Sequence, residues 1–367
     1  MVRWNPTEMV VVETTSKNPS YRYAEGGIFS FMETPTYDKP FKSYEELIEI
    51  MESRHIIIDD KEFALHALQN FSYYGIVNGY KNTFLQVPGT DDFIEGTNFK
   101  ELYTLHIIDT SLNNIIFKYI LFLEKALKSR LSYLIAQKYG VFTDQNDNSF
   151  KNNSDYLYYK NYTNHGKRRI NILRSLHEAI VHPRENPMML HYINKKNHIP
   201  PWILTTNISY GLCIEWYNIL RAEDKNYICS SFLSSGLCSE EESKEFLRKC
   251  FEITKEYRNK IAHGNRTFSI SSLPQLPKKQ LLALTFNTVS EQEYDNKLGQ
   301  DDTMAVLLAL FTLLNDQYLL SNMVDEIAQI LFPYNETTFN GKTVYEIFEL
   351  PNNVIDRLVA LGQRKFS

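Results

Sequence analysis

One short segment near residue 260 combines residue types that could transfer protons beside a phosphate. Arg258, Asn259 and His263 lie within six residues, and Arg266 follows three residues later. On an α-helix Asn259 and His263 are i,i+4 neighbours, so the amide could fix the tautomer and direction of the imidazole. Arg258 projects at another angle, from which its guanidinium can fork onto phosphate oxygens. The spacing therefore predicts acid–base chemistry on a phosphate, with these three as catalytic residues.

This segment must be positioned by the helix that ends there. Ser239 followed by Glu242 is a capping box, and apolar residues recur at helical spacing from Phe246 to Ile261. Gly264 is a typical residue just after a helix end. A purely structural reading stays open, because a basic C-terminal turn also complements the negative end of the helix dipole.

The remaining chain has mostly helical patterns and little strand-like alternation. The spacing of apolar residues, capping residues and prolines predicts an all-α fold. We expect helices over 43–54, 61–70, 102–139, 156–180, 200–220, 239–263, 302–331 and 343–361, and loops over 86–98, 143–155 and 269–299.

Composition narrows the class of protein. The chain has 367 residues, 43% of them apolar, and a formal net charge of −5, which fits a globular protein and excludes a uniformly basic nucleic-acid binder. No apolar run is long enough to span a membrane, and the start lacks a signal-peptide core, so we expect a cytoplasmic protein. The four cysteines and nine histidines show no zinc-site spacing, and the sequence predicts no metal or cofactor.

Several separate segments together resemble the Abi-like (abortive infection) family of bacterial phage-defence proteins, in its AbiD/AbiF group. These segments are Lys39–Glu46, Ile56–Asp60, Tyr73–Tyr80, Phe122–Arg130 and Pro200–Gly211. The segment Arg258–Arg266 resembles the Arg-x4–6-His motif of HEPN ribonucleases. The similarity covers roughly residues 37–270. Many family members have His-His where this chain has His263 and Gly264, which leaves one candidate imidazole.

The resemblance implies a HEPN-type helical bundle with additional segments. We expect an irregular N-terminal arm over 1–36 and an N-terminal Abi-like helical region over 37–100. A HEPN-type domain carrying the motif would span 101–270, and a C-terminal helical region would span 271–367. No role is transferred to that last region.

The resemblance also implies an activity, which is metal-independent RNA cleavage that leaves a 2′,3′-cyclic phosphate. His263 would move protons and Arg258 would stabilise the charge on phosphorus. Because HEPN sites combine two motifs and this chain has one, we expect a homodimer. The AbiF branch resembles toxins restrained by a structured non-coding antitoxin RNA, so two RNA partners are expected. A catalytically silent RNA-binding or scaffold protein of the HEPN type is the alternative.

RNA binding would need local basic surfaces in this acidic protein. The aromatic segment from Tyr156 runs into a basic cluster, which interleaves rings that can stack with cations that can bind phosphate. A second group lies on the long helix, where Glu124 could add a polar contact or simply pair with Lys128. The predicted RNA-binding residues are Lys160, Lys167, Arg168, Arg169, Lys128, Arg130, Tyr74, Lys81 and Arg266. A solvated surface with some tyrosines in the core is the competing interpretation.

Overall fold

The computed structural model describes residues 38–234, 236–264, 266 and 273–367. The predicted arm over 1–36 lies outside these residues. The predicted all-α fold is confirmed, since helices dominate and the strands of the described part form one small hairpin. In that hairpin, β1 (Thr338–Phe339) pairs antiparallel with β2 (Lys342–Thr343).

The helices follow one another with short connections. They are α1 Tyr44–Ser53, α2 Lys61–Tyr80, α3 Phe99–Tyr139, α4 Lys167–Val181, α5 Pro187–Lys195, α6 Pro201–Leu204, α7 Tyr210–Asn218, α8 Ala222–Phe232, α9 Glu240–Ala262, α10 Lys278–Leu284, α11 Glu291–Asp295, α12 Thr303–Leu313, α13 Gln317–Leu331, α14 Val344–Ile347 and α15 Val354–Phe366.

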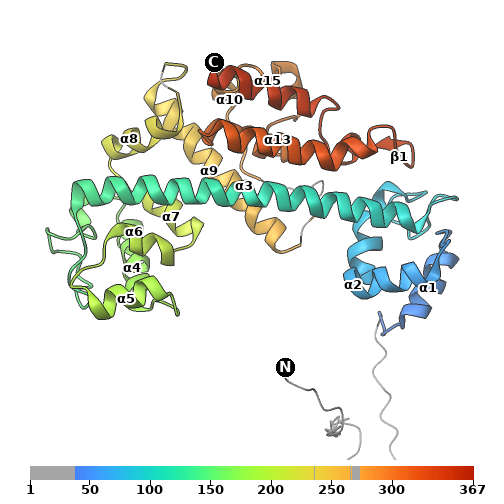
Figure 1. Ribbon diagram of the computed structural model, residues 1–367, viewed down its shortest axis with the longest axis horizontal. Helices are drawn as coiled ribbons and strands as arrows, with labels where there is room; N and C mark the ends of the chain where they lie inside the picture. Colours follow the sequence, from blue (N-terminus) through green and yellow to red (C-terminus); the bar gives the residue numbers. More distant parts are fainter. Residues whose placement is uncertain (1–37, 235, 265, 267–272) are drawn as a thin grey trace, which may run out of the picture.

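Helix α3 is the central element of the molecule. It has 41 residues, which corresponds to about 60 Å of helix. A capping box of Asn98 and Glu101 starts it, and Gly140, at φ +74°, ends it as the sequence predicted. Figure 1 shows α1 and α2 at one end of α3, α4 to α7 at the other, and the C-terminal helices along one side.

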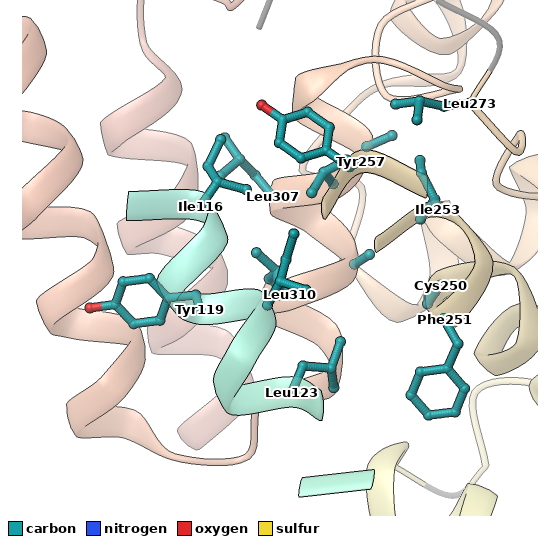
Figure 2. Packing of buried hydrophobic residues seen from close by; sticks show 14 of the residues in the cluster. Ile116, Tyr119, Leu123, Cys250, Phe251, Ile253, Tyr257, Leu273, Leu307 and Leu310 are labelled. Atoms are coloured by element: carbon teal, nitrogen blue, oxygen red, sulfur yellow. The ribbon is translucent and has the colours of Figure 1, made fainter. Parts of the chain in front are cut away.

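Helix α9 crosses α3 and forms the centre of the core with it (Figure 1). The Ser239 and Glu242 side chains make the predicted capping box, and buried residues then recur along one face. Figure 2 shows this packing, in which side chains of α3, α9 and α12 meet. Its labelled members include Ile116, Leu123, Ile253, Leu307 and Leu310, all of them fully buried.

The C-terminal helices share this core. Every residue of α12 is buried, and α12 contacts α3, α9 and α15. Helix α13 lies along α3, where Glu326 accepts hydrogen bonds from Lys118 and Tyr119. The single helical block predicted over 302–331 is interrupted, because Asp316 caps a new helix two residues after α12 leaves helical geometry at Leu314.

Other predicted elements also need correction. The helices expected over 200–220 and 343–361 are each interrupted, the first between α6 and α7 and the second between α14 and α15. The expected helix over 156–180 begins only at Lys167, because Tyr156 and Tyr162 are buried in the preceding loop. Trp216 Nε1 on α7 donates to the Tyr162 hydroxyl at 2.9 Å. The helix expected to end at residue 70 continues to Tyr80 across a kink at Ser72, whose φ is +62°. The described part of the predicted 269–299 loop contains α10 and α11, because their apolar side chains reach the core.

Candidate active site

The last turn of α9 positions the Arg/His motif. His263 is the residue that ends the helix, and its backbone N–H donates to the carbonyls of Asn259 and Lys260 at 3.2 Å. Gly264 follows at φ +79°, a conformation that favours glycine and turns the chain away from the helix axis. The His263 side chain is therefore exposed just beyond the helix end.

Arg258 is held at the same helix end but is partly buried. Its guanidinium carbon lies 5.7 Å from the centre of the Phe117 ring on α3, and Nη1 donates to Asn259 Oδ1 at 3.2 Å. Its Nε is buried and has no hydrogen-bond partner among the described residues, and no described carboxylate pairs with the guanidinium. A fixed, uncompensated guanidinium beside an exposed imidazole suits an anionic ligand.

Asn259 joins the two residues in a way that the sequence did not predict. Its amide oxygen accepts from Arg258, and its backbone carbonyl accepts from the His263 backbone N–H. The expected amide–imidazole hydrogen bond is not among the contacts of the described residues. Asn259 therefore contacts the guanidinium through its side chain, and its backbone carbonyl helps to close the last helical turn before His263.

A chain of buried polar groups lies directly behind the motif. The Tyr257 hydroxyl on α9 donates to Asn113 Oδ1 on α3 at 3.2 Å, and Asn113 Nδ2 donates to Asp109 Oδ1 at 3.4 Å. The Tyr80 hydroxyl at the end of α2 donates to Asp109 Oδ2 at 2.9 Å. Asp109 is only 2% exposed. A buried carboxylate is costly unless donors surround it, so this chain fixes α2, α3 and α9 against one another.

Two side chains at the Tyr80 end of this series have altered acidity. Burial and the Asp109 carboxylate raise the pKa of Tyr80 well above its ordinary value, which keeps the phenol protonated as a donor. Burial, and then the positive charge of Arg266, lower the pKa of His106, whose Nδ1 lies 3.5 Å from the Tyr80 hydroxyl. Both shifts favour neutral side chains around the carboxylate.

The sequence contains a signal for this series of buried polar groups, but the spacing of charged residues alone did not reveal it. Asp109 and Asn113 are i,i+4 polar residues inside the apolar stripe of α3 that includes Leu105, Leu112 and Ile116. Paired polar residues on a buried helix face need partners from other elements. Their partners, Tyr80 and Tyr257, lie 29 and 144 residues from the residues that they contact, and so could not be read from local spacing.

The end of the motif folds back onto α2. Arg266 Nη2 donates to the Tyr74 carbonyl at 3.4 Å, and its guanidinium carbon lies 5.4 Å from the Tyr80 ring centre. A Cβ atom at Gly79 would lie 2.5 Å from Arg266 Nε, so only glycine permits this approach. The Tyr74 side chain beside this contact is 72% exposed. Two predicted RNA-binding residues, Arg266 and Tyr74, therefore meet next to the motif.

The other predicted RNA-binding residues on α2 and α3 have partners within the protein. Lys81 pairs with Asp91 at 2.7 Å. Lys128 pairs with Glu124 at 2.8 Å, the pairing foreseen as the structural reading, and donates to the Ile208 carbonyl at 2.7 Å. Arg130 packs 3.8 Å from the centre of the Phe232 ring, and burial lowers the pKa of its guanidinium.

The basic segment of Lys160 and the first turn of α4 lies in a separate set of contacts. Arg168 pairs with Glu215 on α7 at 2.7 Å, and Arg169 lies 5.1 Å from the Tyr159 ring centre while donating to the Tyr162 carbonyl at 3.4 Å. Lys160 and Lys167 are exposed. The structure therefore places Arg258, Asn259 and His263 at the end of α9 and Arg266 against Tyr74 just after it, whereas the contacts of the basic segment are with α7 and with the loop around Tyr159.

Within the described residues, no group of three or more His, Cys, Asp or Glu side chains is arranged to hold a metal ion. None of the helices in that part of the chain is both long and apolar enough to cross a membrane. Burial raises the pKa of the Cys213, Cys229 and Cys250 thiols, so these cysteines are not activated nucleophiles.

Comparison with known proteins gives one match. The sequence model of the family described as Abi-like protein matches residues 66–269, more than half of the chain. This range runs from α2 to just beyond the Arg/His motif and includes both ends of the buried polar chain. No curated protein and no solved structure matches the chain.

Proposed function

This chain belongs to the Abi-like protein family, and from that premise we propose that it is a metal-independent RNA endonuclease of the HEPN type. Membership of the family associates the chain with abortive infection, a form of phage defence. Cleavage of host or phage RNA in the cytoplasm would stop growth of the infected cell. The end of α9 would carry the reaction.

One observation carries this proposal. At a single helix end, His263 is exposed while Arg258 is fixed by Phe117 and Asn259 with no described carboxylate to neutralise it. A structural helix-capping cluster needs no such fixed orientation of the arginine. An oriented guanidinium next to an accessible imidazole is the arrangement that phosphate transfer requires.

The proposed reaction uses the RNA's own 2′-hydroxyl as the nucleophile. The 2′ oxygen bonds to the adjacent phosphorus, the bond from phosphorus to the 5′ oxygen breaks, and a 2′,3′-cyclic phosphate and a 5′-hydroxyl result. One imidazole removes the 2′ proton and another group returns a proton to the 5′ oxygen. Arg258 stabilises the negative charge on the phosphate oxygens during the exchange.

The need for two proton-transfer groups supports a homodimer. Each chain supplies one His263, so a second copy would bring a second imidazole and a second guanidinium to the same phosphate. Arg266 and Tyr74 lie beside the motif and would hold flanking nucleotides by charge and stacking. Lys160 and Lys167 are exposed and would contribute to binding a structured non-coding antitoxin RNA at another surface.

Product analysis tests this function. Wild-type protein should cleave RNA in the presence of EDTA and leave 2′,3′-cyclic phosphates, because no metal takes part. His263→Ala should reduce the rate about 10²–10⁴-fold, the range expected for loss of an acid–base group. Arg258→Ala should reduce it about 10²–10³-fold, the range expected for loss of a donor that stabilises developing charge. His182→Ala is the matched control, since it removes an exposed imidazole on α4 and should leave the rate unchanged.

Two outcomes would contradict the proposal. Cleavage at the wild-type rate by His263→Ala would show that the imidazole has no chemical role, and strict dependence on a divalent ion would point to another mechanism. If no variant and no wild-type preparation cleaves RNA while RNA remains bound, the alternative of a silent RNA-binding or scaffold protein would replace it.

A further inference from the structure

A cavity lies at the other end of α9 from the Arg/His motif. It has a volume of about 400 Å³ and opens between the loop before α4, the junction of α7 and α8, and the first half of α9. That volume lies within the range of small-molecule sites. Thr163 ties two of these walls together, because its N–H and its hydroxyl donate to the Ile219 and Leu220 carbonyls, both at 2.9 Å.

Three basic and two acidic residues line the cavity, so positive charge is in slight excess around Lys225. Lys225 lines the wall contributed by α8, and Lys244 and Arg248 of α9 face the same space. Arg168 adds positive charge from α4. Burial and then these three cations, with Lys244 the first of them, lower the pKa of Lys225. The same crowding acts on His165, whose pKa is lowered by burial and then by Lys225.

Lys225 differs from its neighbours because it lacks a carboxylate partner. Lys244 pairs with Glu241, Arg248 pairs with Glu252 at 2.6 Å, and Arg168 pairs with Glu215. No ion pair or hydrogen bond joins the Lys225 ammonium to any described residue. Glu241 and Glu245 also line the cavity, but neither forms an ion pair with the Lys225 ammonium. A half-buried ammonium without a bonded carboxylate is unfavourable unless an anion approaches it.

We propose that this cavity binds the phosphate group of a nucleotide or of an RNA end. The Lys225 ammonium would be the central donor, and Lys244, which is paired with Glu241, and Asn218 also line the cavity. A phosphate offers acceptors in several directions and a charge near −2, which matches several convergent donors better than a single carboxylate does. A ligand of nucleotide size also fits the volume of the cavity.

The site is separate from the candidate active site. Arg248 and Arg258 are ten residues apart on α9, which corresponds to about 15 Å along the helix. Variants in the cavity therefore leave the Arg258 and His263 surroundings intact. The proposal does not require that the protein cleaves RNA, so a failure of one claim leaves the other standing.

A binding experiment on the full chain tests the proposal. The probes are AMP and a 2′-O-methyl oligonucleotide, which resists cleavage, made with either a 5′-phosphate or a 5′-hydroxyl. Lys225→Gln should weaken phosphate-dependent binding at least about tenfold, the effect of losing one hydrogen bond to a charged group. Lys225→Arg should retain most of the binding, and Lys100→Gln, an exposed lysine near the start of α3, is the matched charge control.

The probes separate the two sources of phosphate. Binding of AMP that Lys225→Gln abolishes would assign the site to a free nucleotide. A preference for the 5′-phosphorylated oligonucleotide, lost in Lys225→Gln without AMP binding, would assign it to an RNA end. Equal affinity of wild type and Lys225→Gln for every probe would overturn the proposal, provided that both proteins show the same thermal unfolding midpoint.

Discussion

The end of α9 and the basic segment at the start of α4 both concentrate cations, but they differ in whether those cations have partners within the protein. At the end of α9, Arg258 has no described carboxylate partner and His263 is exposed. In the basic segment, Arg168 pairs with Glu215 and Arg169 packs on Tyr159. Residue types alone therefore do not identify a binding surface, because partners from distant parts of the chain decide which charges remain available.

The two regions also differ in the buried side chains on which they pack. The motif rests on the buried chain from Tyr257 through Asn113 and Asp109 to Tyr80, whereas the basic segment covers buried tyrosines and a surface ion pair. We infer that rigidity is concentrated at the motif. Four changes test this difference, in order of decreasing expected effect.

The largest effect on stability is expected at Asp109. Asp109→Ala would leave the Tyr80 hydroxyl and the Asn113 amide without their buried acceptor, which should lower the free energy of unfolding by about 2–4 kcal/mol. Asn114→Ala removes an exposed polar side chain from the same helix and should change it by less than about 0.5 kcal/mol. Denaturant unfolding measures the free energy of unfolding of both variants. Equal values for Asp109→Ala and Asn114→Ala would show that the buried polar groups do not fix the motif.

A smaller effect is expected at Gly79. In Gly79→Ala the new Cβ would meet the Arg266 guanidinium at 2.5 Å, so the flexible arginine should move away from Tyr74 and Tyr80. RNA affinity should fall by several-fold, with a stability change of about 1 kcal/mol or less. Gly75→Ala is the control, since its Cβ would meet only Ser72 Oγ at an ordinary 3.5 Å. Unchanged RNA binding by Gly79→Ala would remove Arg266 from the interface.

Neutralising the basic segment should have a limited effect on RNA binding. Changing Lys167, Arg168 and Arg169 to Gln should reduce the log–log salt slope by about 0.7–0.9, the value for one phosphate contact, because the two arginines already have partners. A reduction of the salt slope that corresponds to three phosphate contacts would show that RNA displaces Glu215 and the other partners of the two arginines. If the bound RNA restrains a toxin, this triple variant should also be more toxic in cells that express that RNA.

The smallest effect is expected from the ion pair on this surface. Glu215→Ala removes the partner of Arg168, but both side chains are well exposed, so the free energy of unfolding should change by 1 kcal/mol or less. The same variant frees Arg168 for RNA, and affinity should rise slightly at low salt. Weaker RNA binding by Glu215→Ala would contradict the view that Glu215 competes with RNA for Arg168.

Local signals predicted the elements that position the motif. The capping box at Ser239, the apolar face of α9 and the stop at Gly264 are all encoded within a few residues, and the structure has each of them. The long helix α3 was likewise predicted because no glycine or proline interrupts it before Gly140. These features depend on helix geometry and not on distant contacts.

Features that depend on tertiary partners were missed. The run from Tyr156 has aromatic residues at spacings that suit a helix, but Tyr162 is fixed in a loop by Trp216, 54 residues away. Asp109 was overlooked because an isolated acidic residue in a helix is normally exposed, and its burial is explained by donors such as Tyr80, which lies 29 residues away. The lack of a partner for Lys225 likewise became visible only when α4, α8 and α9 were placed together.

The most direct test compares the chemical step in the two regions. Single-turnover cleavage of one RNA, measured with protein in excess and in EDTA, separates chemistry from binding. We expect Arg258→Ala and His263→Ala to lose the chemical step, while the Lys167, Arg168 and Arg169 triple variant cleaves at the wild-type rate once RNA is saturated. The reverse result, with cleavage retained in His263→Ala and lost in the triple variant, would contradict the assignment of the active site to the end of α9.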